Sequence, residues 1–219
     1  MGLFSSNCYI IHADQNTAVI VDPGSPDHAL MDELAKLEVK RIAVILTHRH
    51  LDHLAGVPAV YDYCRKNNIE VSLAIHKHDL DAVGKGSLKD HESDLEALGI
   101  PSFSALGIDL PDLPEADTIM EDGNIIEGYR VIHTPGHSPG SVCLYSEEHE
   151  ILFSGDTLFA GSIGRTDLPG GEDRLIVPMI RKKLLVLPPN TVVYPGHGPM
   201  TSIAREIKSN PFLNGDYGS

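Results

Sequence analysis

The sequence predicts a layered α/β domain over residues 1–219, and three observations indicate it. In the first half, apolar runs of strand length alternate with segments whose apolar residues have helical spacing, which is typical of layered α/β domains. In the second half, three apolar runs follow one another before a further helical segment. The chain is 42% hydrophobic, and no linker or repeat divides it. We therefore expect one domain with a full core and no need for disulfide bonds.

The first half contains alternating predicted strands and helices. They are strands at 8–12 and 17–21, a helix at 27–38, a strand at 41–47, a helix at 54–67 and a strand at 71–75. Leu30, Leu34 and Leu37 recur at helical spacing within the first of these helices. The dipeptide Pro23-Gly24 ends the strand before it, because proline and glycine interrupt regular structure.

The second half begins with a loop at 101–117, which is rich in proline and acidic residues and only weakly periodic. The predicted elements that follow are strands at 125–132, 141–145 and 151–154, a helix at 172–187, a strand at 191–194 and a helix at 203–208. A charged turn at 147–150 separates two of these strands. Several apolar runs end in a polar residue beside glycine, which directs attention to the strand ends.

Composition excludes several classes of protein. The chain has 17 Lys and Arg against 31 Asp and Glu, a net charge of −14, which argues against binding to nucleic acid. No run reaches the roughly 18–20 apolar residues of a membrane span, and no signal peptide is visible, so a cytoplasmic protein is expected. Three widely spaced cysteines suit free thiols in a reducing compartment. Twelve histidines are the unusual count.

Four potential metal ligands lie in one short segment after the strand at 41–47. They are His48, His50, Asp52 and His53. In extended chain His48 and His50 point to the same face, whereas Asp52 and His53 come where the chain bends into a helix and can turn toward a second point. Neutral imidazole is a usual ligand for zinc or iron. A histidine-rich loop in solvent is the alternative interpretation, but it would rarely show this spacing at a strand–helix junction.

Three later strands also end in a candidate ligand. His133 follows the strand at 125–132, Asp156 follows 151–154, and His197 follows 191–194. Each residue taken alone would be interpreted as structural. Taken with the first segment, they make five histidines and two aspartates, which is enough for two metal ions.

These residues, with Gly155-Asp156-Thr157-Leu158-Phe159 and Gly164-Arg165-Thr166-Asp167, resemble the metallo-β-lactamase superfamily. Within it, they are most similar to the short, single-domain bacterial members of the glyoxalase II (hydroxyacylglutathione hydrolase) branch. The resemblance covers nearly the whole chain and implies an αββα sandwich with the metals at one edge of the two sheets. It also implies a hydrolase that binds two divalent cations, with zinc expected and iron or manganese as alternatives.

The resemblance also assigns the ligands. The first metal would be held by His48, His50 and His133, the second by Asp52, His53 and His197, with Asp156 bridging. The pair would share a hydroxide that attacks a thioester carbonyl, and Asp52 is the candidate to orient it, or else a ligand only. The β-lactamases of the best-known types would have cysteine in place of Asp156.

The substrate implied is a hydroxyacyl-glutathione, of the S-lactoylglutathione type, or a related small thioester. Arg165 is the candidate contact for the peptide part, with a surface ion pair as the alternative. Only about 20 residues follow His197, too few for the helical domain that holds glutathione in two-domain members, so weaker binding is expected. His137 is interpreted as bracing a ligand or its loop, and the pair His76 and His78 as structural.

Two other activities remain open. A mononuclear iron persulfide dioxygenase would use His48, His133 and Asp156 as a facial triad, and a lactonase would use the full ligand set. The acyl group, the physiological thiol and the oligomeric state are not indicated by the sequence.

Overall fold

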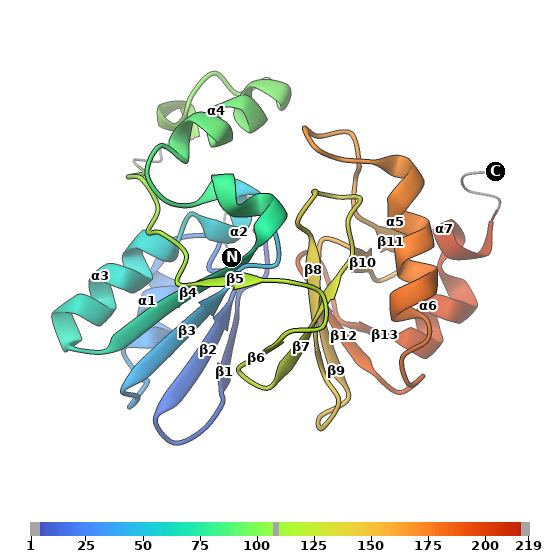
Figure 1. Ribbon diagram of the computed structural model, residues 1–219, viewed down its shortest axis with the longest axis horizontal. Helices are drawn as coiled ribbons and strands as arrows, with labels where there is room; N and C mark the ends of the chain where they lie inside the picture. The colour runs from blue at the N-terminus through green and yellow to red at the C-terminus, as the bar shows by residue number, and fades with distance from the viewer. Residues whose placement is uncertain (1–4, 107–109, 216–219) are drawn as a thin grey trace.

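The first of two central sheets is mostly parallel. The computed structural model of the protein describes residues 5–106 and 110–215 (Figure 1). The sheet's strands, in spatial order, are β1 (Tyr9–His12), β2 (Thr17–Val21), β3 (Arg41–Ile45), β4 (Glu70–His76) and β5 (Thr118–Met120). Strands β1 and β2 form an antiparallel pair, and every later neighbour is parallel. The helices that accompany it are α1 (His28–Leu34), α2 (Leu51–Leu54) and α3 (Val57–Asn67).

The second sheet is mostly antiparallel. Its order is β13 (Thr201–Ser202), β12 (Val192–Pro195), β9 (Ile151–Gly155), β8 (Val142–Ser146), β7 (Tyr129–His133) and β6 (Ile125–Ile126). Strands β9 and β12 are parallel, so their carboxyl ends reach the same edge. A small hairpin of β10 (Leu158–Phe159) and β11 (Ser162–Ile163) follows β9. The outer helices are α5 (Asp173–Met179), its π-helical continuation η4 (Ile180–Leu184), α6 (Ile203–Ser209) and α7 (Pro211–Asn214).

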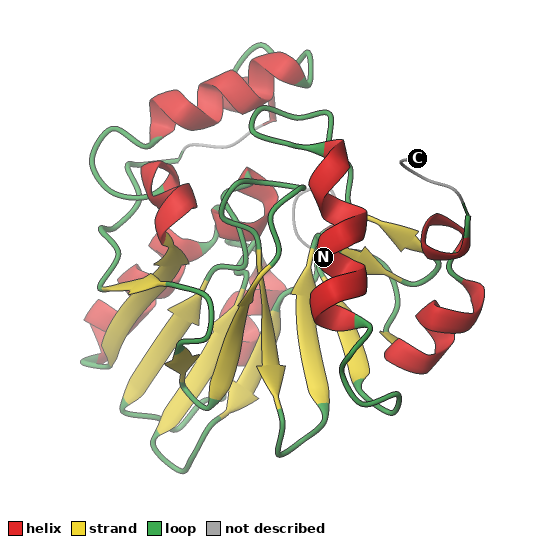
Figure 2. Ribbon diagram, turned by 45° about the vertical axis from the view of Figure 1, so that its right-hand side comes forward, coloured by secondary structure: helices red, strands yellow, loops and turns green. Residues whose placement is uncertain are grey.

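The layers follow from side-chain alternation in the strands. Along β2, Ala18 and Ile20 pack toward the helices of the first sheet, whereas Val19 and Val21 pack against the second sheet. Both faces of such a strand are buried, which explains its continuous apolar run. The views in Figures 1 and 2 show α1 and α3 outside one sheet and α5, α6 and α7 outside the other. The predicted αββα sandwich is therefore confirmed.

Several elements differ from their prediction. The strand expected at 125–132 is the hairpin β6–β7, because Glu127 and Gly128 both have positive φ, at 50° and 83°, and turn the chain. The helix expected at 172–187 passes into the π-helical turn η4. The sequence did not predict the 3₁₀ helices η2 (Lys77–Ala82) and η3 (Phe103–Leu106), the helices α4 (Leu88–Ala97) and α7, the strands β5 and β13, or the β10–β11 hairpin. Residues 107–109 of the predicted loop lie outside the described residues.

The loops that follow β3, β7, β9 and β12 gather at one edge of the two sheets (Figure 2). Helix α4 lies over this edge in both ribbon views. Across the described ranges, no helix combines the length and the apolar character needed to cross a membrane.

Candidate metal centre

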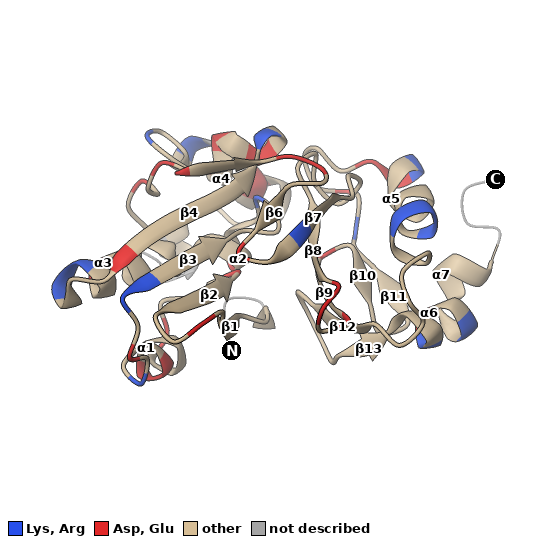
Figure 3. Ribbon diagram, turned by 60° about the horizontal axis from the view of Figure 1, so that its bottom comes forward, with Lys and Arg blue, Asp and Glu red and all other residues tan. Residues whose placement is uncertain are grey.

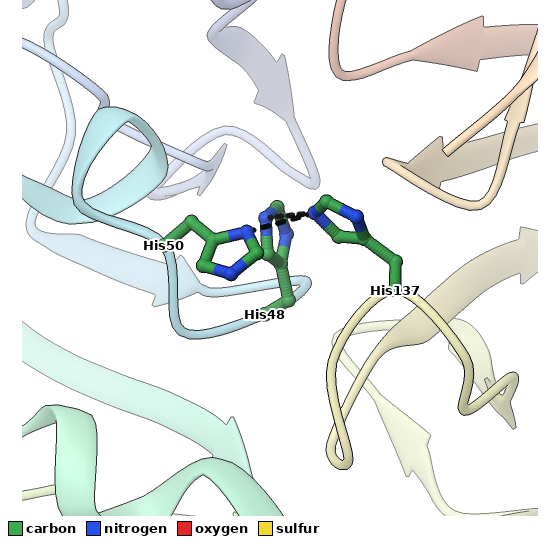
Figure 4. A group of neighbouring side chains, drawn as sticks. All are labelled: His48, His50 and His137. Atoms are coloured by element: carbon green, nitrogen blue, oxygen red, sulfur yellow. Dashed lines mark hydrogen bonds between the residues drawn. The ribbon is translucent and has the colours of Figure 1, made fainter. Parts of the chain in front are cut away.

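Three buried imidazoles converge at this edge (Figure 4). His48 and His50 come from the loop after β3, and His137 comes from the loop between β7 and β8. His137 Nε2 lies 2.8 Å from His50 Nδ1 and 3.2 Å from His48 Nε2. Burial lowers the pKa of all three side chains, so the rings are neutral and can act as ligands.

The hydrogen bonds behind two of these rings determine where their lone pairs point. A carbonyl oxygen can only accept, so the bond of 2.7 Å to the Arg165 carbonyl requires His137 Nδ1 to carry its proton. The Thr47 hydroxyl donates to Asp22 Oδ2, at 2.6 Å, and therefore accepts from His48 Nδ1, at 3.0 Å. Both Nε2 atoms then present lone pairs to each other. Two lone pairs at 3.2 Å repel unless a cation lies between them, and this arrangement fits a metal ion.

Asp52, His53 and His197 form a second group of ligands. Asp52 and His53 belong to the short helix α2, and His197 follows β12. His197 Nε2 is 3.1 Å from Asp52 Oδ2 and 3.4 Å from His53 Nε2. The segment after β3 thus turns as predicted, with two side chains facing one group and two facing the other.

The Asp156 carboxylate lies between the two groups. Its Oδ2 is 3.6 Å from His137 Nε2 and 3.4 Å from His197 Nε2, and its Oδ1 is 3.4 Å from His53 Nε2. Asp156 Oδ1 and His50 Nε2 are both buried, and neither has a hydrogen-bond partner within the described part of the chain. A Cβ atom at Gly196 would overlap Asp156 Oδ1, so glycine is required beside this carboxylate. Buried polar atoms without a hydrogen-bond partner indicate that a partner is missing. Because the atoms here are imidazole nitrogens and carboxylate oxygens, the missing partner is a cation.

The second group has an excess of negative charge. Burial opposes protonation of His53, but the carboxylates of Asp156, Asp52 and Asp22 outweigh it and raise the pKa of this imidazole above its usual range. Burial also opposes ionisation of Asp52, yet the neighbouring His53 and His197 hold the pKa of its carboxyl below its usual range. A pocket that favours a proton on a fully buried ring would favour a divalent cation even more strongly.

Asp22, at the end of β2, supports ligands of both groups. Its Oδ1 accepts from the Thr47 amide at 2.7 Å, and its Oδ2 accepts from the Thr47 hydroxyl at 2.6 Å and from His53 Nδ1 at 2.9 Å. Asp22, His48 and His53 lie close enough together that they could themselves hold a metal ion. Because both oxygens already accept hydrogen bonds, we assign Asp22 to orienting the rings. Asp22 is not among the site residues predicted from the sequence, although a carboxylate after a fully buried strand was the available signal.

Replacing Asp22 by asparagine is expected to weaken metal binding at both groups by about 10–100-fold, the usual effect of losing a carboxylate behind a ligating histidine. An amide offers one acceptor oxygen where the carboxylate has two, so the bonds to Thr47 and His53 cannot all form. The measurement is a competitive titration with a chelator. Asp14→Asn is the matched control, because the Asp14 carboxylate accepts hydrogen bonds from the Asn16 and Thr17 amides but lies in an exposed turn. Wild-type metal affinity in Asp22→Asn would exclude this role.

The structure corrects the prediction for His133. Its Nε2 donates to the Pro139 carbonyl at 2.9 Å, and its ring stacks on His76 with centroids 4.0 Å apart, outside both ligand groups. His133 ends β7 on the same side as Val131, which faces the first sheet. The chain then loops through Pro135 and Gly136 and brings His137 to the place predicted for His133. The resemblance had put the ligand at the strand end rather than four residues beyond it.

A cavity of about 490 Å³ opens onto the two groups. Asp52, Asp156 and His197 line it together with Arg165, the predicted substrate contact. The Arg165 guanidinium forms two hydrogen bonds with the Asp167 carboxylate, at 2.7 and 2.8 Å. Arg165 is thus at the cavity, but its charge is already paired.

The fold and the two ligand groups define a metal-dependent hydrolase. The chain belongs to the metallo-β-lactamase superfamily, whose family model matches residues 1–197. It is 33% identical to the probable metallo-hydrolase YqgX of Bacillus subtilis over 98% of this chain and 95% of that protein. It is also 33% identical to the hydroxyacylglutathione hydrolase GloC of Haemophilus influenzae, over 96% of this chain and 94% of GloC.

Solved structures show the same likeness. The BLEG-1 B3 metallo-β-lactamase is 37% identical, with a TM-score of 0.79 over 96% of this chain and 95% of that one. A structure of TTHA1623 in a di-iron-bound form is 34% identical, with a TM-score of 0.79 over 97% of this chain and 98% of that one. The protein is therefore a metallo-hydrolase with metal-binding His and Asp clusters, and the choice of substrate and metal belongs to the proposal below.

Proposed function

We propose that the protein is a dinuclear thioesterase that hydrolyses hydroxyacyl-glutathione or a related small thioester. The position of Asp156 carries the proposal. Its carboxylate lies 3.4–3.6 Å from ligand nitrogens of both groups, as a bridging ligand between two cations would. The name of GloC supports the substrate class, and the two-iron form of TTHA1623 supports a pair of metals.

The chain's residues divide the work of the reaction. His48, His50 and His137 would hold one cation, Asp52, His53 and His197 the other, and Asp156 would touch both. When bound, the two cations activate water as the nucleophile and polarise the thioester carbonyl. Asp52 borders the cavity with one oxygen facing His197, so its other oxygen can orient the attacking water. The water oxygen bonds to the carbonyl carbon, the carbon–sulfur bond breaks, and the products are a carboxylic acid and a thiol.

Two further candidates compete with this one. The likeness to a B3 metallo-β-lactamase favours β-lactam hydrolysis, which needs the same activated water. The persulfide dioxygenase triad predicted with His133 is not assembled, because His133 lies against His76. With His137 in its place, a one-iron site would leave the second group of Asp52, His53 and His197 unused.

Metal content and substrate are tested together. After reconstitution with zinc, the protein should contain about two metal ions per chain by elemental analysis, because seven ligands with one bridging carboxylate satisfy two cations. It should hydrolyse S-lactoylglutathione and consume no oxygen with glutathione persulfide. One iron per chain with oxygen uptake would establish the dioxygenase instead. Two metals with hydrolysis of nitrocefin and of no thioester would establish the β-lactamase.

A further inference from the structure

The cavity beside the metal groups has an apolar wall. It is lined by Leu95 of α4, by Leu98 at the C-terminal end of that helix, and by Phe159 and Ile163 of the β10–β11 hairpin. Its volume of about 490 Å³ is in the usual range for a site that takes a small organic molecule. Cations held by the ligand groups at the same cavity would engage only the reacting carbonyl of a thioester. A further part of the substrate must therefore lie against the apolar residues.

Helix α4 presents this wall because of how it is anchored. His91, Asp94, Leu95 and Leu98 are spaced as one helical face, and all four line the cavity. His91 Nε2 donates to the Ala82 carbonyl at 2.9 Å, and Asp94 Oδ2 lies 3.6 Å from Arg49 Nε. Arg49 is the residue between His48 and His50. The polar members of the face thus hold the helix over the site, and the leucines remain as its apolar part.

The charges around the cavity disfavour an anionic substrate tail. Among the described residues that line it, Arg165 is the one guanidinium or ammonium group, and Asp167 already pairs with it. Helix α4 carries four carboxylates and one lysine in its sequence (Figure 3). Glutathione brings two carboxylates to a thioester, and neither would find an unpaired guanidinium or ammonium group among these lining residues. An aliphatic tail would meet leucine, isoleucine and phenylalanine instead.

We propose that the cleft selects thioesters with an uncharged aliphatic acyl chain of several carbons, packed between α4 and the β10–β11 hairpin. This inference rests on the proposed thioesterase activity. It makes Leu95, Leu98, Phe159 and Ile163 determinants of specificity and leaves hydroxyacyl-glutathione as a weaker substrate.

The wild-type enzyme, loaded with zinc, should be assayed on acetyl, butanoyl and hexanoyl thioesters of N-acetylcysteamine, a neutral thiol. We expect kcat/KM to rise about two- to fourfold for each methylene buried. The adipoyl thioester has the hexanoyl chain ended by a carboxylate, and its kcat/KM should be lower by about tenfold or more because the charge is buried without a partner. Isothermal titration calorimetry should show the same preference for hexanoate over adipate.

Leu98→Asn should flatten the rise of kcat/KM with chain length, because it replaces apolar wall by an amide. Leu98 is 37% exposed, so its replacement is compatible with folding. Val186→Asn is the matched control, since Val186 is 71% exposed and does not line the cavity. This control should keep the wild-type rise.

The outcomes separate the two proposals. If no thioester is hydrolysed by fully loaded enzyme, the thioesterase proposal fails. If thioesters are hydrolysed but kcat/KM is flat or falls with chain length, or if adipoyl is preferred to hexanoyl, the selectivity proposal fails while the thioesterase stands. The series on the wild-type enzyme decides this even if Leu98→Asn does not fold.

Discussion

His137→Ala is expected to lose the metal of the first group and to reduce the hydrolysis rate by about 10²–10³ or more, whereas His133→Ala keeps both metals and most activity. Removing one stabiliser of a developing charge already costs about 10²–10³ in rate, and loss of a ligand also removes the cation. His137 Nε2 faces both His48 and His50, at 3.2 and 2.8 Å, while His133 is bonded to the Pro139 carbonyl. Elemental analysis and initial rates of the two variants measure the difference.

The two histidines are four residues apart, His133 at the end of β7 and His137 in the loop that follows, so each variant controls for the other. His133→Ala removes its hydrogen bond and its stacking on His76, and a modest loss of thermal stability is its expected consequence. The opposite pattern, with metal lost from His133→Ala and kept in His137→Ala, would restore the assignment made from the sequence.

His197→Ala is expected to leave about one metal per chain and to lower the hydrolysis rate by at least about 10²–10³. His197 Nε2 lies 3.1 Å from Asp52 and 3.4 Å from Asp156, so its loss opens the second group while the first stays complete. The metal count and the rate should therefore fall together. A control for the same loop is Met200→Ala, because Met200 is exposed and lies three residues further along the chain.

This variant also distinguishes the two classes of enzyme. A one-iron dioxygenase with His48, His137 and Asp156 as ligands would not need His197, so it would retain iron and much of its oxygen consumption. A His197→Ala protein that keeps its full metal content and its activity would falsify the dinuclear hydrolase.

The strands and most of the ligand positions could be predicted because they depend on local spacing. Continuous apolar runs such as 17–21 and 41–47 indicated strands buried on both faces, and β2 and β3 are buried in that way. The spacing of His48 and His50 placed them on one face, and the bend after them separated Asp52 and His53. Each of these inferences involves neighbours within one element, where geometry is nearly invariant.

Helix α4 escaped prediction even though its inner face has helical spacing. His91, Asp94, Leu95 and Leu98 follow one another at intervals of three, one and three residues. Only two of the four are apolar, because the other two anchor the helix to Ala82 and Arg49. The spacing of hydrophobic residues alone therefore did not predict this helix, and the apolar wall of the cavity was missed with it.

The sequence by itself determined the layered α/β class and indicated six of the seven candidate ligands that the structure brings together. Only the tertiary structure decided that His137 and not His133 completes the first group, and that Asp22 supports ligands of both groups. The physical reason is that these contacts join separate strands: His137 reaches the first sheet from the second, and Asp22, after β2, contacts Thr47 and His53 after β3. The alternation of side chains along a strand determines which way each of them points. The path of the loop after β7, by contrast, determines which histidine reaches the first sheet.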